Sequence, residues 1–177
     1  MIYVHVDRGR SSRNVMAHKT KQLLKGVDYI GVNCVFWCHD GKGNVLMHKR
    51  SKNCRDEQGK WDCGGGSMDF GETFEQTVRR EVAEEYGVKP LKMEYIATKN
   101  VLRKHNGQLT HWIKNMFWVL VDPKKVRNME PEKIDEIGWF TFDKLPSPLH
   151  SQIIPEVDMI RKFLKGRVEK RRKKYGK

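Results

Sequence analysis

The sequence predicts an α/β sandwich of the α+β kind, in which helices cover a mixed β-sheet. Short runs rich in β-branched and aromatic residues recur through the middle of the chain, separated by turn-forming residues. Only two segments carry apolar residues at a clear helical spacing. Strands interspersed with so few helices favour a sheet packed against helical layers. A length of 177 residues fits one such domain with short extensions.

A β-hairpin is expected first. Residues 29–38 (YIGVNCVFWC) form an apolar run that predicts a buried strand, and the turn-forming residues 39–44 follow it. Residues 45–49 then fit the partner strand of the hairpin. The polar residues 50–60 predict a loop. It leads to the glycines at 64–66, which predict a flexible turn whose backbone can approach a ligand closely.

A helix is predicted over residues 74–86, because neither glycine nor proline interrupts this stretch. Thr73, with a glutamine three residues later, fits a capping box at the helix start. Gly87 stands where a helix-ending glycine belongs. Val78 and Val82 are one turn apart and therefore share a face suited to the core.

Three further strands and a second helix complete the domain. The strands are expected at residues 91–103, 111–121 and 137–142, where apolar and β-branched side chains concentrate. A turn joins the first two strands, and a polar loop precedes the third. Residues 153–164 carry apolar side chains every three or four positions, which predicts a helix with one face on the core.

We place the domain at residues 28–165, between two extensions. Residues 1–27 form an N-terminal extension, in which residues 2–6 alternate like a short strand and residues 14–24 fit a short helix. Residues 166–177 are expected to form a basic, disordered tail.

The net charge of +13 is unevenly distributed along the chain. Residues 161–177 carry a net charge of +9 and residues 1–27 carry +5, whereas residues 28–160 carry −1. The basic character therefore belongs to the two ends. Clusters of Lys and Arg bind phosphate backbones, so contact with nucleic acid is expected there.

Composition excludes several classes of protein. No apolar run approaches the roughly 18–20 residues of a membrane span, and the first residues lack the apolar region of a signal peptide. Four cysteines without a C-x2-C pair favour free thiols in a reducing cytoplasmic setting over a zinc site. We expect a monomer or a homodimer without membrane contact.

Three carboxylates gather on one face of the first predicted helix. Glu84 and Glu85 follow Glu81 at i+3 and i+4, so the three side chains project together. Such a cluster repels itself, and hard oxygen ligands suit Mg²⁺ or Mn²⁺, which relieve the repulsion. Arg80 stands one turn before Glu84 and can hold that carboxylate in place. The alternative interpretation is a charged, solvated helix face.

The spacing around these residues resembles a known signature. Gly66 is followed by five residues, Glu72, seven residues and then the stretch REVAEEYGV, which fills every fixed position of G-x5-E-x7-R-E-U-x-E-E-x-G-U. This is the signature of the Nudix hydrolases. The similarity extends over about residues 28–150 and favours the MutT-like nucleotide pyrophosphohydrolase branch. It implies a Nudix-type α/β/α sandwich. Gly64 replaces a proline common in the family, which loosens the turn.

The resemblance also implies the residues that bind metal and act in catalysis. The implied ligands of Mg²⁺, with Mn²⁺ as an alternative, are Gly66, Glu81, Glu84, Glu85 and Glu132. The implied catalytic residues are Arg80, Glu84, Glu85 and Glu132, with Glu84 and Glu132 as candidates for activating water. Glu130 is the fallback for Glu132.

Three residues are candidates for contact with the substrate. Arg50, at the end of the second strand, is a candidate for a phosphate contact, although a surface arginine is the plain alternative. Asn33 lies on the opposite face of its strand from Cys34 and could read a base edge. Gly65 is the third.

The reaction implied is hydrolysis of a nucleoside diphosphate linked to a further group. A nucleoside triphosphate, cleaved to monophosphate and pyrophosphate, is the first expectation. The basic ends motivate an alternative, removal of a cap or pyrophosphate from RNA. Nucleotide-sugar or ADP-ribose cleavage is a further alternative, weakened because Lys104 and His105 occupy the region where a marker proline or tyrosine is expected. A non-catalytic nucleic-acid-binding module is the alternative outside the enzymes.

Overall fold

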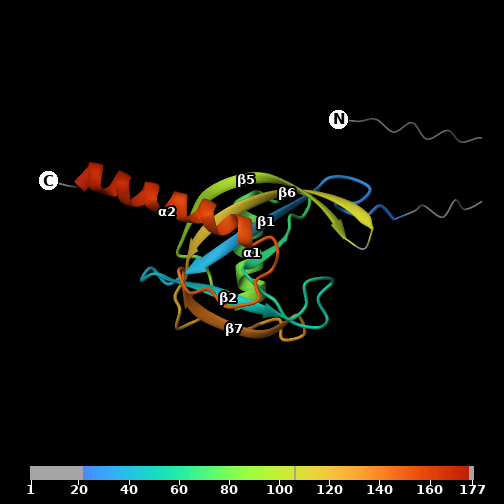
Figure 1. The fold of residues 1–177 in the computed structure, drawn as a ribbon, viewed down its shortest axis with the longest axis horizontal. Coiled ribbons are helices and arrows are strands. Elements are labelled where there is room, and N and C mark those ends of the chain that lie inside the picture. The colour runs from blue at the N-terminus through green and yellow to red at the C-terminus, as the bar shows by residue number, and fades with distance from the viewer. Residues whose placement is uncertain (1–21, 106, 176–177) are drawn as a thin grey trace, which may run out of the picture.

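The computed structural model describes the backbone of residues 22–105 and 107–175 (Figure 1). In chain order the elements are β1 (Gly31–His39), β2 (Asn44–Arg50), β3 (Trp61–Asp62), β4 (Gly64–Ser67), α1 (Phe74–Tyr86), β5 (Lys92–His105), β6 (Gln108–Leu120), β7 (Ile134–Thr141) and α2 (Ile154–Tyr175). The expected strand at residues 2–6, and most of the expected helix at 14–24, lie outside the described residues. Residues 22–24 are not helical.

Within these described residues the strands form one mixed sheet in the order β3-β2-β1-β6-β5, with β4 paired to β1 and β7 paired to β2. β1 runs parallel to β6, while β2 and β4 pair with β1 in antiparallel fashion. The predicted hairpin of residues 29–49 is present as β1 and β2. The mixed sheet with two helices confirms the predicted fold class.

The two helices cover opposite faces of the sheet, and the alternation of β1 shows why. Cys34, Phe36 and Cys38 pack with residues of α1 in one buried cluster. Trp37 belongs to a second cluster, which includes Ile160 of α2. Successive side chains of a strand point to opposite faces, so an apolar run such as β1 supplies both cores.

Helix α1 begins and ends as the sequence predicts. Thr73 accepts a hydrogen bond from the Gln76 amide, and the Gln76 side chain accepts one from the Thr73 amide, which completes the capping box. Gly87 adopts a left-handed conformation with φ 64° and ends the helix. Because both ends of the helix are fixed in this way, the positions of the glutamates along α1 are fixed as well.

The glycines predicted as a flexible turn form strand β4 instead. Gly64, Gly65 and Gly66 pair with Phe36, Val35 and Cys34 of β1. Backbone hydrogen bonds to a central strand supply the order that glycine propensity does not. The backbone of the signature loop is thereby held against the sheet.

The expectation of a disordered tail from Gly166 is wrong, because α2 continues to Tyr175. Lys, Arg and Glu are good helix formers, so the charged segment extends an existing helix at little cost. Arg167 anchors it: its guanidinium lies 2.7 Å from the Glu94 carboxylate on β5 and 5.8 Å from the centre of the Phe163 ring. Figure 1 shows α2 projecting beyond the sheet. Among the described residues, no helix is long and apolar enough to span a membrane.

Candidate active site

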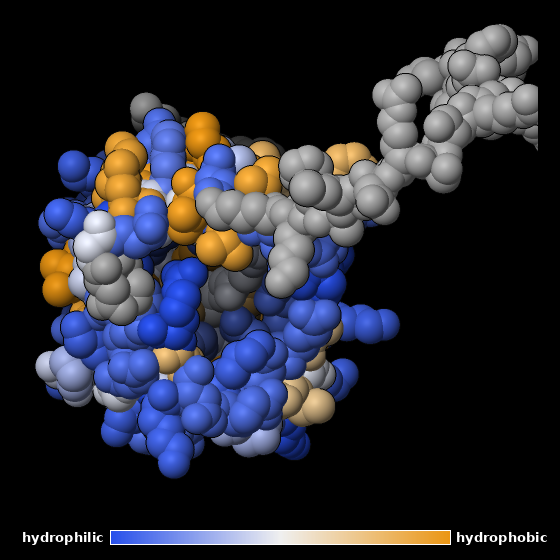
Figure 2. Space-filling model, turned by 90° about the vertical axis from the view of Figure 1, so that its right-hand side faces the viewer, coloured by the Kyte–Doolittle hydropathy of each residue, from blue (hydrophilic) through white to orange (hydrophobic). Residues whose placement is uncertain are grey.

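The structure contains a cleft of about 560 Å³. Its walls come from β1, β4, α1, the loop between β2 and β3, the β5–β6 pair and the first turn of α2. In Figure 2 a hollow is bordered mainly by hydrophilic residues, with hydrophobic residues gathered above it. The volume is adequate for a small ligand.

Two carboxylates of α1 lie against strand β4 on one side of this cleft. The Gly65 amide donates a hydrogen bond to Glu85 Oε1 at 3.2 Å. A Cβ atom at Gly66 would collide with the Glu81 carboxylate. Position 66 therefore requires glycine if Glu81 is to keep this place.

Burial perturbs both carboxylates. Desolvation raises the pKa of Glu85 well above its usual range, and the neighbouring charges of Glu81 and Glu130 add to the effect. Desolvation likewise raises the pKa of Glu81, against the opposing influence of Arg80. Glu85 Oε2 is buried and lacks a hydrogen-bond partner. A buried oxygen without a partner, beside other carboxylates, fits a bound cation.

Arg80 organises the signature loop. Its guanidinium contacts Glu72 at 2.8 and 2.9 Å, Glu81 at 2.6 Å and Glu84 at 3.1 Å, and donates to the Ser67 carbonyl at 3.0 Å. Hydrogen bonds from Arg80 lower the pKa of Glu72 to about 2. Arg80 therefore joins the loop before α1 to the helix itself.

The residues present fit a divalent cation, although they are not grouped around one centre. Among the described residues, no three His, Cys, Asp or Glu side chains already form a metal cluster. The side chain of Glu84 is 52% exposed and paired with Arg80 rather than turned to the cleft. Hard oxygen donors, the partnerless oxygen of Glu85 and the glycine backbone beside Glu81 nevertheless suit Mg²⁺ or Mn²⁺.

The geometry favours Glu130 over Glu132 as the downstream carboxylate. Glu130 lines the cleft, and its negative charge contributes to raising the pKa of both Glu81 and Glu85. The side chain of Glu132 does not line the cleft, whereas its backbone carbonyl accepts a hydrogen bond from Ser51 at 2.7 Å. A backbone turn explains why the two side chains are placed differently. In this turn the Lys133 amide donates a hydrogen bond to the Glu130 carbonyl.

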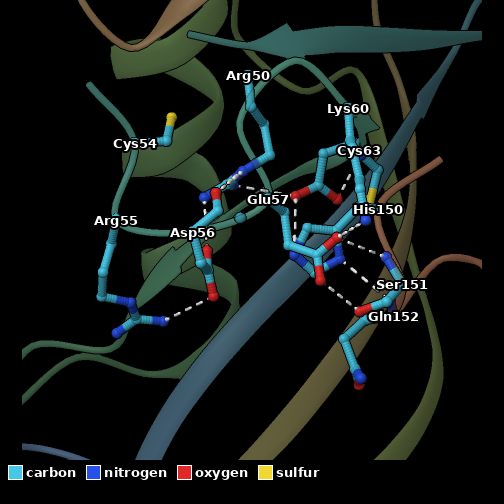
Figure 3. Close-up of polar contacts among 12 residues, drawn as sticks. Arg50, Cys54, Arg55, Asp56, Glu57, Lys60, Cys63, His150, Ser151 and Gln152 are labelled. Atoms are coloured by element: carbon cyan, nitrogen blue, oxygen red, sulfur yellow. Dashed lines mark hydrogen bonds and ion pairs between the residues drawn. The ribbon is translucent and has the colours of Figure 1, made fainter. Parts of the chain in front are cut away.

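Arg50 lines the cleft, but acidic neighbours hold its guanidinium. Its guanidinium lies 3.0 Å from the Asp56 carboxylate (Figure 3) and 3.1 Å from the Asp62 carboxylate. Its charge is therefore largely balanced, and it anchors the loop between β2 and β3. Asn33 also lines the cleft, and its Oδ1 atom is buried without a partner.

Several cleft residues are absent from the sequence-based assignment. The structure adds His48, Asp62, Arg103, Lys114, His150 and Glu156. His48 contacts the Tyr86 hydroxyl at 2.7 Å, and burial lowers its pKa to about 4. A charged residue inside an apolar run marks Lys114 in the sequence. The others carry no local signal, because they meet only through the fold.

The family is shown by comparison with known proteins. A family model described as a NUDIX domain matches residues 30–163, which is most of the chain. The protein therefore belongs to the Nudix hydrolase family.

Individual relatives agree with this assignment. The chain is 30% identical to an uncharacterized Nudix hydrolase of Yersinia pestis over 145 residues, 79% of this chain and 74% of the relative. It is 32% identical over 111 residues to the NAD-capped RNA hydrolase NudC of Pseudomonas aeruginosa, 63% of this chain and 36% of NudC. This chain thus spans about a third of the NudC length.

Solved structures share the fold. The crystal structure of a MutT NUDIX hydrolase from Burkholderia pseudomallei superposes with a TM-score of 0.66 at 26% identity, covering 75% of this chain and 98% of that one.

Proposed function

We propose that this Nudix hydrolase cleaves a nucleoside diphosphate linked to a further group, and that a nucleoside triphosphate is its principal substrate. The products are then a nucleoside monophosphate and pyrophosphate. The observation that carries the proposal is the meeting of Glu81, Glu85 and a glycine strand in a cleft large enough for a nucleotide. A buried carboxylate cluster beside a close-approach backbone suits a polyphosphate bound through cations.

Each residue of the cluster has a role in this scheme. Glu81, Glu85 and the Gly66 carbonyl would hold Mg²⁺ (or Mn²⁺), and Glu84 would join them once its carboxylate leaves Arg80 and turns to the cleft. A cation held there would supply positive charge to neutralise the diphosphate and to polarise its phosphorus. Arg80 positions Glu81 and Glu84 through the contacts described above and does not touch the substrate.

A carboxylate must also accept the proton of the attacking water. We assign this role to Glu84 or to the downstream carboxylate, for which Glu130 is preferred to Glu132 because Glu130 lines the cleft. The water oxygen bonds to phosphorus, the bridging P–O bond breaks, and the leaving phosphate takes the electron pair. Lys133, whose pKa is raised by its hydrogen bond to Glu130, supplies positive charge at the same wall.

An RNA 5′ end is a second candidate substrate. One relative is named a NAD-capped RNA hydrolase, and a capped end also contains a nucleoside diphosphate linked to a further group. The C-terminal part of α2 is rich in Lys and Arg and would provide contact with the RNA backbone. The four free cysteines support a reducing, cytoplasmic setting for either substrate.

A product-resolved hydrolysis assay tests the proposal. Nucleoside triphosphates, nucleotide sugars, dinucleotides and triphosphorylated or NAD-capped RNA are incubated with the protein and Mg²⁺. We expect monophosphate and pyrophosphate in equal amounts from a triphosphate. Turnover of capped RNA alone would make RNA the substrate, and no turnover of any compound would leave a binding module.

A further inference from the structure

A buried ion pair on the α2 side of the cleft lies outside the carboxylate cluster that we assign to hydrolysis. Lys114 Nζ of β6 lies 2.6 Å from Glu156 Oε1 in the first turn of α2. The two side chains are only 8% and 3% exposed, yet both residues line the cleft. Burying such a pair is costly, so its position at a ligand cavity calls for a reason beyond stability.

Two acceptor atoms beside this pair have no hydrogen-bond partner. They are Glu156 Oε2 and Asn33 Oδ1, both buried. A buried acceptor without a partner costs about 1–3 kcal/mol. An ion pair that only fastened α2 to the sheet would leave these two atoms unexplained. Each of them can accept a hydrogen bond from a ligand that brings its own N–H groups.

Strand register places the cluster beside the metal end of the cleft. Asn33 pairs with Ser67 of β4 on one side and with Lys114 of β6 on the other. Neighbouring strands are about 4.8 Å apart, so Lys114 stands roughly 10 Å across the sheet from the glycine strand. A nucleotide with its phosphates at Gly66 can therefore extend its base toward Lys114.

An aromatic side chain lies next to this position. Trp112 stands two residues before Lys114 on the same face of β6 and also lines the cleft. Its indole packs against the backbone of Gly26 and Gly31, where any Cβ atom would collide with it. A ring fixed in this way can stack on a base, a contact worth about 1–3 kcal/mol.

The polar groups select among the bases by their donors and acceptors. Two unpartnered acceptors require two N–H donors, and Lys114 requires an acceptor. Guanine presents N1–H, N2–H and O6 on one edge. Hypoxanthine and uracil offer only one ring N–H there, while adenine and cytosine turn a ring acceptor toward the carboxylate. A phosphate is disfavoured, because Glu156 would repel it.

We propose that Asn33, Lys114 and Glu156 read the Watson–Crick edge of guanine, so that this cleft takes a guanine nucleotide. The inference rests on the proposed function, because the proposed function places the phosphates of the nucleotide at the glycine strand. Lys114 donates to O6, and the free oxygens of Glu156 and Asn33 accept from N1–H and N2–H. These residues determine specificity and take no part in bond cleavage.

Equilibrium binding of GMP, IMP and AMP, measured calorimetrically without divalent metal, tests the proposal. The full chain should bind GMP about 10–100-fold more tightly than AMP, with IMP between them. Glu156→Gln should remove most of this preference by lowering the affinity for GMP, while the affinity for AMP changes by less than about threefold. Equal affinities in the wild type, equal losses for both nucleotides in the variant, or no binding of any nucleotide would overturn the proposal.

Two further variants separate base reading from helix docking. Glu94→Gln weakens a different ion pair that holds α2, the one between Glu94 and Arg167, which lies outside the cleft. It should leave the ratio of GMP to AMP affinity unchanged, and a changed ratio would overturn the proposal. Asn33→Ala removes a side-chain oxygen without a partner and should fold even if Glu156→Gln does not. It should abolish the preference for GMP over IMP, and retention of that preference would contradict base reading.

Because this binding assay requires neither metal nor turnover, its outcome is independent of the hydrolysis assay. A protein that cleaves triphosphates but binds GMP and AMP equally retains the proposed function and loses only the base assignment. A protein that prefers GMP but cleaves no anhydride retains the base assignment and loses the proposed function.

Discussion

The two sides of the cleft bring charged groups together in different ways. On the α1 side, Glu81 and Glu85 come from one helix turn, and Glu85 meets a glycine only 20 residues before it. On the α2 side, Lys114 and Glu156 stand 42 residues apart and meet only when α2 packs on the sheet. Helical periodicity sets the first arrangement, so a short motif can encode it. Tertiary packing sets the second, which no local pattern encodes.

The largest expected effect lies on the α1 side. Glu85→Gln removes a cation ligand without changing shape, and we expect kcat for the best substrate to fall by about 1,000-fold or more. Glu75→Gln, on the exposed face of the same helix, is the matched control and should retain activity. Wild-type turnover by the Glu85 variant, measured as pyrophosphate release, would place the chemistry elsewhere.

The next largest effects concern Gly64 and Gly66 of β4, where added methyl groups should change turnover and stability to different extents. The atoms nearest to a methyl group at Gly66 belong to the Glu81 carboxylate, so Gly66→Ala should displace this carboxylate and reduce turnover about 100-fold, with a smaller effect on stability. A methyl group at Gly64 meets the buried ring of Phe36 as well as the Glu85 carboxylate, so Gly64→Ala should lower the free energy of unfolding by about 1–3 kcal/mol in addition to reducing turnover. Denaturant unfolding and initial rates measure both. Equal stability losses would contradict this division.

A smaller effect distinguishes the two downstream carboxylates. Glu130 lines the cleft and Glu132 does not, so Glu130→Gln should reduce kcat about 10–100-fold while Glu132→Gln changes it by less than about threefold. Steady-state rates with saturating Mg²⁺ give the comparison. A larger loss in the Glu132 variant would restore the residue that the sequence favours.

The smallest effect concerns Glu57, in the loop between β2 and β3 that lines the cleft. Burial opposes ionisation of Glu57, but hydrogen bonds from Lys60 and Ser151 outweigh it and lower its pKa to about 2 (Figure 3). Because the folded-state pKa lies below the ordinary 4.5, the stabilisation is complete above pH 4.5 and is lost as pH falls to about 2.

Glu57→Gln should therefore cost about 1 kcal/mol of unfolding free energy at pH 7, and the difference from wild type should shrink below pH 4.5. Urea unfolding at several pH values measures it, with the exposed Glu136→Gln as the control. A difference that stays constant down to pH 2 would show that this carboxylate is not held in its ionised form.

Local signals predicted the fold class and helix α1, because a capping box, a helix-ending glycine and apolar periodicity are each read within a few residues. Local signals gave wrong predictions where the structure of a segment depends on residues far away in the sequence. Strand β4 is ordered by pairing with β1 and not by its own glycines. The end of α2 is fastened to β5 through Arg167 and Glu94, which composition alone does not reveal.

The same limit applies to the site. Helical spacing aligned Glu81 with Glu85, and the structure brings both to the glycine strand. The choice between Glu130 and Glu132 depended on one backbone turn, formed by the amides of Lys133 and Ile134 on the Glu130 carbonyl. Arg50, a candidate phosphate contact from its position in the sequence, is held by Asp56 and Asp62, which lie on two separate segments.

Binding of Mn²⁺, followed by electron paramagnetic resonance of the free ion, tests the central claim that Glu85 and the glycine strand form a divalent-cation site. The wild-type chain and Glu75→Gln should bind Mn²⁺ with equal affinity. Glu85→Gln should bind it at least about 10-fold more weakly. Unchanged Mn²⁺ affinity in the Glu85 variant would contradict the account.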